Sequence, residues 1–218
     1  MNPVVYAGFL VFALVASITP GPNNLMLMAS GVNYGLGRTL PHLAGVCLGF
    51  GVMAFAVGLG LAGVFHAAPW LYAVLRWASA AYILYLAYKM VRSKGVGTAV
   101  TSGRPMSFLG AAAFQWVNPK AWVMALGAIT AYAAPAHLAR DVAVMSVSFV
   151  VINIPCGLTW AMSGVGIKRF LKRGRTLQIF NAVMALLLVL SLYPLITEPL
   201  GPARPPPGVI IGTPRATG

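Results

Sequence analysis

Residues 17–24 read Ser17-Ile18-Thr19-Pro20-Gly21-Pro22-Asn23-Asn24 and interrupt an apolar run near the start of the chain. A second interruption, at residues 115–120, reads Gln115-Trp116-Val117-Asn118-Pro119-Lys120. Proline has no amide hydrogen and disrupts the helix that precedes it, but it is favoured as the first residue of a new helix. Each stretch therefore predicts that one half-helix ends and another begins.

The runs on either side of these breaks are apolar enough to lie in a membrane. The chain has 218 residues, of which 59% are hydrophobic and 8% are charged, whereas a soluble domain carries roughly 25% charged residues. A helix needs roughly 20 apolar residues to cross a bilayer. Six stretches meet this length: about 4–28, 41–64, 70–91, 108–134, 142–165 and 177–197. The prediction is an all-α integral membrane protein with six transmembrane helices, of which the first and fourth are broken.

The positive charges predict how the helices are oriented. Cytoplasmic loops of membrane proteins collect Lys and Arg. Ten of the fifteen Lys and Arg residues fall in the first, third and fifth connections: Arg38; Lys89, Arg92, Lys94 and Arg104; Lys168, Arg169, Lys172, Arg173 and Arg175. These connections are therefore predicted to be cytoplasmic, and both termini to lie outside. The net charge of +13 then follows from topology and requires no nucleic-acid partner.

The scarcity of acids excludes several kinds of chemistry. Asp141 and Glu198 are the two acidic residues of the chain, so neither a paired-carboxylate glycosidase nor an acidic metal cage can form. Cys47 and Cys156 are too far apart in sequence for a CxxC motif or a Cys-ligated zinc site. The GxSxG serine of an intramembrane protease is also missing. We expect no enzyme activity, no metal and no cofactor.

The two breaks occupy corresponding positions in two halves of the chain. Each half has an odd number of spans, so repeats of about 4–92 and about 108–197 must be inverted across the membrane. Pro20 and Pro119 match at an offset of 99 residues. At about 1.5 Å per residue, both breaks lie about 15 Å from the cytoplasmic boundary and are expected to face each other near the midplane. Residues 1–197 would form one transporter domain, followed by a disordered Pro/Gly-rich tail at 198–218.

The breaks also predict a binding site for an anion. With Thr19 and Asn118 as N-caps, the unpaired amides of the two new half-helices would point into the gap with positive dipole ends. These amides belong to Gly21, Asn23, Asn24, Lys120 and Ala121. The carbonyls that the prolines free belong to Ala16, Ile18 and Gln115. Two facing helix starts form an anion site, and the alternative is that the prolines are simple kinks.

Lys120 gives the predicted site its charge. A lysine near the middle of a membrane costs roughly 2.5–3.5 kcal/mol and normally faces a cavity or a partner. No predicted span contains an acid that could pair with Lys120. Unless its side chain reaches the membrane interface, its partner is therefore a backbone carbonyl, a water or a bound carboxylate. An anion site beside acceptors for an ammonium suits an α-amino acid. The expected binding residues are Thr19, Pro20, Gly21, Pro22, Asn23, Asn24, Gln115, Asn118, Pro119 and Lys120.

The chain resembles the LysE/RhtB family of bacterial amino-acid exporters over about residues 1–197, and within it the cysteine/O-acetylserine exporter branch. The most specific shared motifs are Thr19-Pro-Gly-Pro-Asn23 and the stretch from Gln115 to Lys120. Weaker matches are Ser30-Gly31, Gly35-Leu-Gly37, Ala44-Gly45, Gly49, Trp77-Ala78 and residues 81–87. The resemblance implies efflux of amino acids across the bacterial inner membrane, driven by a proton or ion gradient.

The resemblance also narrows the substrate. Members that export lysine or arginine carry an acid in or near the second span, and residues 41–47 contain none. A small neutral amino acid or derivative of the cysteine, O-acetylserine, homoserine and threonine class is therefore expected, exported by alternating access. Without a carboxylate relay, Lys120 and His42 are the candidates for carrying a coupling proton. A channel or a non-transporting scaffold is the alternative.

Small and polar residues elsewhere leave two further questions. The GxxxG pairs at residues 31–35 and 45–49 permit close helix contact, either inside one bundle, which is the commoner case, or in a homodimer. Asn153 and Asn181 lie in predicted spans, where they either hydrogen-bond across helices or line the substrate path.

Overall fold

The computed structural model describes residues 2–61, 70–92, 104–168, 175–191 and 193, and in these ranges all secondary structure is helical. Two helical segments there are long and apolar enough to cross a membrane, Leu36–Gly60 and Pro135–Lys168, and a bent pair of helices adds a third if it counts as one span. Phe108–Val117 and Arg175–Leu190 are apolar but shorter. The all-α membrane class is confirmed, and the six-span arrangement stays a prediction. The predicted tail, 198–218, lies outside the described residues.

The first break separates α1 (Pro3–Ile18) from α2 (Pro22–Tyr34), whose axes are bent by 51°. A residue that precedes proline is pushed out of the helical conformation. Thr19 precedes Pro20 and is extended, and Gly21 precedes Pro22 and is extended as well. The prediction that Thr19 caps the second half-helix is therefore wrong: Thr19 ends α1, and Gly21 is the N-cap of α2.

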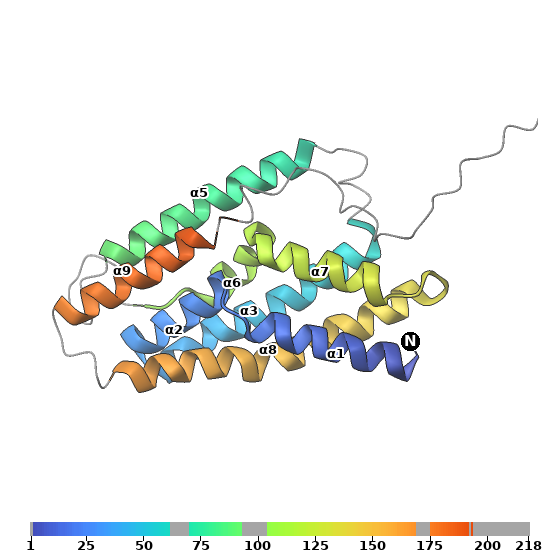
Figure 1. The fold of residues 1–218 in the computed structure, drawn as a ribbon, viewed down its shortest axis with the longest axis horizontal. Helices are drawn as coiled ribbons and strands as arrows, with labels where there is room; N and C mark the ends of the chain where they lie inside the picture. The colour runs from blue at the N-terminus through green and yellow to red at the C-terminus, as the bar shows by residue number, and fades with distance from the viewer. Residues whose placement is uncertain (1, 62–69, 93–103, 169–174, 192, 194–218) are drawn as a thin grey trace, which may run out of the picture.

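The second break separates α6 (Phe108–Phe114) from α7 (Pro119–Tyr132), with one 3₁₀ turn, η2 (Gln115–Val117), between them. Asn118 is the N-cap of α7, as predicted, because its Oδ1 accepts from the backbone amide of Lys120 at 3.1 Å. Both breaks lie near the middle of the long axis of the molecule (Figure 1).

The remaining helices are longer or shorter than predicted at their ends. They are α3 (Leu36–Ala56) with a π-helical extension η1 (Val57–Leu61), α5 (Trp70–Arg92), a short turn η3 (Pro135–His137), α8 (Leu138–Lys168) and α9 (Arg175–Leu190). α3 begins five residues earlier than expected because Gly35 adopts a φ of +80°, which lets the chain turn sharply right after α2.

Glycines set the closest helix contacts. A side chain at Gly31 on α2 would collide with the backbone of Ala161 on α8, and one at Gly164 on α8 would collide with the backbone of Met28. Gly45 and Gly49 on α3 face α6 in the same way. The contacts of Gly31, Gly45 and Gly49 are therefore internal to the bundle, while Gly35 forms the turn before α3.

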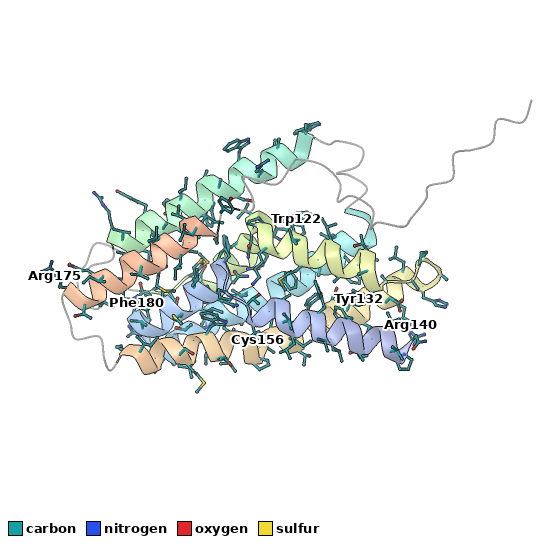
Figure 2. All side chains as sticks on the ribbon, viewed as in Figure 1. Trp122, Tyr132, Arg140, Cys156, Arg175 and Phe180 are labelled. Atoms are coloured by element: carbon teal, nitrogen blue, oxygen red, sulfur yellow. The ribbon has the colours of Figure 1, made fainter. Side chains whose placement is uncertain are left out.

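Two further contacts connect the halves of the chain: α3 packs along α8, and α5 packs along α9. The ends of α2, α5 and α8 and the starts of α3 and α9 gather at one end of the molecule, opposite the N-terminus (Figure 1). Figure 2 shows Arg175 at this end and Arg140 at the other. The described cations of the odd-numbered connections at this end are Arg38, Lys89, Arg92, Lys168 and Arg175.

Candidate functional site

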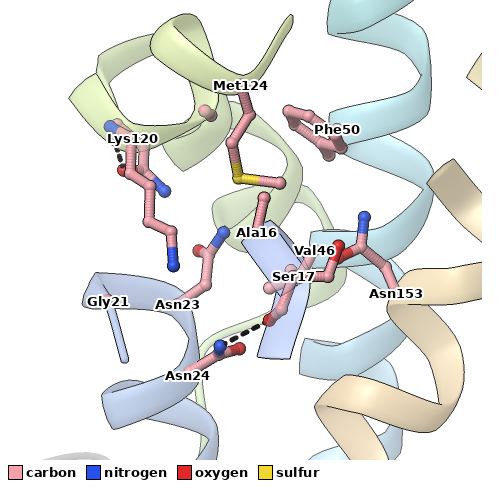
Figure 3. A pocket seen from close by; sticks show the side chains of 12 residues that line it. Ala16, Ser17, Gly21, Asn23, Asn24, Val46, Phe50, Lys120, Met124 and Asn153 are labelled. Atoms are coloured by element: carbon pink, nitrogen blue, oxygen red, sulfur yellow. Dashed lines mark hydrogen bonds between the residues drawn. The ribbon is translucent and has the colours of Figure 1, made fainter. Parts of the chain in front are cut away.

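A pocket lies between the two breaks and is partly open, with about 380 Å³ of space free of atoms, a volume that includes solvent at its mouth (Figure 3). Its lining comes from α1, α2, α3, α7 and α8 and from the break before α7. The lining residues are Ala16, Ser17, Gly21, Asn23, Asn24, Val46, Phe50, Asn118, Lys120, Ala121, Met124 and Asn153. No acid is among them, and no group of three His, Cys, Asp or Glu side chains comes together anywhere in the described part of the chain.

Lys120 joins the two breaks across the pocket. Its Nζ donates to the backbone oxygen of Thr19 at 2.8 Å, to Thr19 Oγ1 at 2.9 Å and to the backbone oxygen of Pro20 at 3.3 Å. The sequence allowed a backbone carbonyl, a water or a bound carboxylate as the partner of Lys120, and the structure shows backbone carbonyls in this role. Because carbonyls at a helix C-terminus carry partial negative charge, the ammonium also stabilises the end of α1.

Gly21 leaves room for this lysine. A Cβ atom at Gly21 would lie 2.7 Å from Lys120 Cδ and 3.1 Å from Lys120 Nζ. The backbone of Gly21 is extended, a conformation open to any residue, so the constraint is the space above it. Because Gly21 has no side chain, the ammonium can reach the carbonyls of Thr19 and Pro20.

A reciprocal amide pair forms a second connection between the breaks. Asn23 Nδ2 donates to Gln115 Oε1 at 2.8 Å, and Gln115 Nε2 donates to Asn23 Oδ1 at 3.1 Å. Gln115 Nε2 also donates to the backbone oxygen of Ala111 at 2.8 Å. Gln115 is fully buried behind the pocket, so it orients Asn23, which lines it.

The carbonyls that the sequence predicted to be free already have partners. The oxygen of Ala16 accepts from Thr19 Oγ1, that of Ile18 accepts from Trp160 Nε1 at 3.0 Å, and that of Gln115 accepts from the amide of Asn118. This prediction is wrong because it considered the prolines alone and left out donors from neighbouring and distant side chains. The next oxygens, of Ser17, Thr19 and Pro20, accept from Asn24 and Lys120 instead.

The starts of α2 and α7 differ in which groups remain available to bind an anion. At the start of α7, the amides of Lys120 and Ala121 bond to Asn118, so the prediction that they point unpaired into the gap is wrong. The start of α2 has no side-chain cap, and its N-cap, Gly21, lines the pocket beside the Lys120 side chain. One uncapped helix start and one ammonium therefore lie together.

The predicted site residues fall into three groups. Gly21, Asn23, Asn24, Asn118 and Lys120 line the pocket. Thr19, Pro20 and Gln115 hold those side chains through hydrogen bonds, while Pro22 and Pro119 begin the two half-helices.

His42 does not belong to this pocket. It is 1% exposed on α3, its Nδ1 lies 3.0 Å from Ser30 Oγ, and its Nε2 has no partner among the described residues.

Sequence reasoning missed the apolar wall of the pocket. Met124 follows Lys120 by four residues, so helical spacing places both on one face of α7, and this signal was available. Val46 and Phe50 on α3 gave no signal, because nothing in an apolar run marks the residues that face a distant break. Asn153 on α8 lines the pocket, one of the two roles expected for it.

Long apolar helices around a pocket lined by polar and apolar residues define the class of multi-pass membrane proteins. The family model described as LysE type translocator matches residues 14–196. The chain therefore belongs to the LysE type translocator family.

Individual relatives agree with this assignment. A cysteine/O-acetylserine efflux protein from Klebsiella pneumoniae is 32% identical over 201 residues, which cover 91% of this chain and 100% of that protein. An Escherichia coli protein with the same description is 32% identical over 194 residues, which cover 87% of this chain and 96% of that protein. No solved structure matches the chain.

Proposed function

We propose that this protein is a secondary transporter of the bacterial inner membrane that exports small neutral amino acids or their derivatives from the cytoplasm. The observation that carries the proposal is Lys120, whose ammonium lies in a polar pocket between two broken helices and is held by the oxygens of Thr19 and Pro20. The relatives described as cysteine/O-acetylserine efflux proteins support cysteine and O-acetylserine as substrates. Homoserine and threonine belong to the same chemical class.

The substrate carboxylate binds at the start of α2. There it meets the positive end of an uncapped helix and the ammonium of Lys120, which passes over Gly21. Hydrogen bonds between charged groups are roughly twice as strong as neutral ones. A carboxylate is therefore a better partner for Lys120 than the carbonyls that it contacts in this structure.

The substrate ammonium takes the place that Lys120 gives up. When the carboxylate draws Lys120 Nζ toward itself, the oxygens of Thr19 and Pro20 become free to accept from a second ammonium. The exchange keeps every group paired, which matters because a polar group left unpaired within a membrane is costly. A cationic side chain would find no acid in the lining to pair with, so a neutral substrate is favoured.

Alternating access follows from two inverted repeats, about 4–92 and about 108–197. The corresponding helices of the proposed repeats pack together, α3 with α8 and α5 with α9. The two breaks are joined through side-chain hydrogen bonds, those of Lys120 and of the Asn23–Gln115 pair. Rocking of one repeat against the other would open the site to each side in turn.

A proton is the coupling ion in this scheme, carried by His42 or by Lys120. Histidine changes charge near neutral pH. His42 is buried, with Ser30 on one ring nitrogen and no partner among the described residues on the other, so protonation would change its surroundings strongly. His42→Gln is expected to uncouple export from the proton gradient while substrate binding persists.

The test is to overproduce the chain in a bacterium and to measure the extracellular accumulation of a panel of neutral and basic amino acids. Lys120→Ala is expected to lower export at least about tenfold at equal membrane abundance, since it removes charge-assisted hydrogen bonds. Lys168→Ala, which removes an exposed lysine at the end of α8, is the matched control. Unchanged export by Lys120→Ala would contradict the proposed binding site.

The same assay separates the transporter from its alternatives. A channel would give a flux that rises linearly with substrate and ignores the proton gradient. A scaffold would give no flux of any compound.

A further inference from the structure

The pocket has a side that the proposed amino-acid head group does not use. Figure 3 shows Lys120 and Gly21 on one side and Asn153 on the other. Of the polar lining residues away from Lys120, Asn24 is already bonded to backbone oxygens, which leaves Ser17 on α1 and Asn153 on α8. Val46, Phe50 and Met124 are apolar lining residues of this part. A short substrate side chain would extend into this part.

Ser17 is an exception among the hydroxyl groups of the bundle. In α3, α7 and α8 most hydroxyl groups are satisfied within their own helix, by a carbonyl four residues earlier. The examples are Thr39, Thr130, Ser148, Thr159 and Ser163. Ser17 is only 5% exposed, and its Oγ has no partner among the described residues. A buried hydroxyl without a partner normally has a reason, and a ligand is one.

Asn153 offers complementary groups from the facing helix. Its side chain is half-buried, and no hydrogen bond connects it to another residue in the described part of the chain. An amide carries both a donor and an acceptor, whereas a hydroxyl serves as either. Together they match a single polar atom that can donate or accept.

We infer that Ser17 and Asn153 form the side-chain recognition site of the transporter. They hydrogen-bond the hydroxyl, thiol or ester oxygen of a short substrate side chain, while Val46, Phe50 and Met124 enclose its carbon atoms. The inference rests on the proposed function and goes further, because it selects polar side chains over aliphatic ones of the same size. Sites that hydrogen-bond a substrate group discriminate well against analogues that lack it.

The test compares homoserine with norvaline, which has a methyl group in place of the terminal hydroxyl, as labelled substrates in proteoliposomes of the full chain. The wild-type protein is expected to transport homoserine better. Ser17→Ala and Asn153→Leu are each expected to lower the ratio of the two rates by about 3- to 10-fold, the value of one hydrogen bond. Ser17→Thr, which keeps a hydroxyl, restores part of the ratio.

Ser146→Ala is the matched control, because Ser146 is the other buried hydroxyl without a partner in the described residues and it does not line the pocket. If Ser17→Ala and Asn153→Leu slow both substrates in parallel, the two residues act on structure and the inference is overturned. An unchanged ratio in both variants also overturns it, while loss of export in Lys120→Ala would still support the proposed function. If the wild-type protein transports neither substrate, the inference is overturned, while transport of cysteine or O-acetylserine would still support the proposed function.

Discussion

Lys120 has two roles, one in this structure and one in the proposed transport cycle. In this structure it bonds to the oxygens of Thr19 and Pro20 and so holds the broken ends of two helices together. In the proposed cycle the same ammonium binds the substrate carboxylate. Substrate binding would then release the contact between α1 and α7. In this way, occupancy of the pocket by substrate is coupled to movement of the two helices.

Gly21 tests this arrangement without touching the charge. Gly21→Ala adds a methyl group that would lie 2.7 Å from Lys120 Cδ, so the lysine must move away from the carbonyls of Thr19 and Pro20. Transport is expected to fall about tenfold, with normal membrane abundance, because charge-assisted hydrogen bonds are disturbed. Gly37→Ala adds its methyl group to open space and is the control. Equal rates for the two variants in the export assay would contradict the close packing of Lys120 over Gly21.

The amide pair gives a second prediction at this scale. Asn23→Leu leaves the buried Gln115 amide without its partner, and Gln115→Leu does the same to the half-buried Asn23 amide, so each is expected to destabilise the purified protein by about 1–3 kcal/mol. Because the two side chains act as a unit, the double variant should lose clearly less than the sum of the single losses. Thermal unfolding in detergent measures this. Strictly additive losses would show that the pair makes no specific contribution.

Helices α2 and α8 contact each other backbone to backbone, which makes their crossing sensitive to any added atom. Gly164→Val is expected to destabilise the protein by about 1–3 kcal/mol because its side chain would meet the backbone of Met28. Gly166→Val, two residues further along α8, meets nothing and is the control. Thermal unfolding of both variants in detergent checks the contact, and similar midpoints would argue against it.

Much of the arrangement of elements is predictable from the sequence, and the reasons are local. The residue before a proline is disfavoured in a helix, and both interruptions appear in the structure where residues 17–24 and 115–120 place them, whereas Pro41 and Pro155 lie inside α3 and α8 without ending them. The same rule, applied also to Pro22, predicts the start of α2 correctly. Asn118 was recognised as a cap because capping involves neighbours in the chain.

The parts that could not be predicted depend on distant residues. Trp160 donates to the oxygen of Ile18 from 142 residues away, and nothing in the sequence near Ile18 announces it. The apolar wall formed by Val46 and Phe50 has the same cause, since their neighbours in the chain are equally apolar. Whether a residue faces the pocket depends on how the helices pack, and this cannot be predicted from composition.

The whole molecule has two chemically different ends. Arg175 and four further cations of the odd-numbered connections, Arg38, Lys89, Arg92 and Lys168, lie at the end opposite the N-terminus, and Arg140 lies at the other (Figure 2). The rule that cytoplasmic loops collect positive charge predicts that the end with Arg175 is cytoplasmic.

Single cysteines test this orientation. A membrane-impermeant maleimide is expected to label Arg140→Cys in intact cells and Lys168→Cys only after permeabilisation, because both positions are exposed at opposite ends. The native thiols, Cys47 and Cys156, are buried and give a low background. The reverse labelling pattern would contradict the proposed topology.

The most direct test of the central claim is the initial rate of O-acetylserine or cysteine transport, measured against substrate concentration in proteoliposomes with an imposed proton gradient. The wild-type protein should saturate and respond to the gradient, and Lys120→Ala should fall to the rate of empty liposomes while Lys168→Ala keeps the wild-type curve. A rate that rises linearly without saturating, or a Lys120→Ala curve that matches wild type, would contradict a transporter that binds its substrate at Lys120.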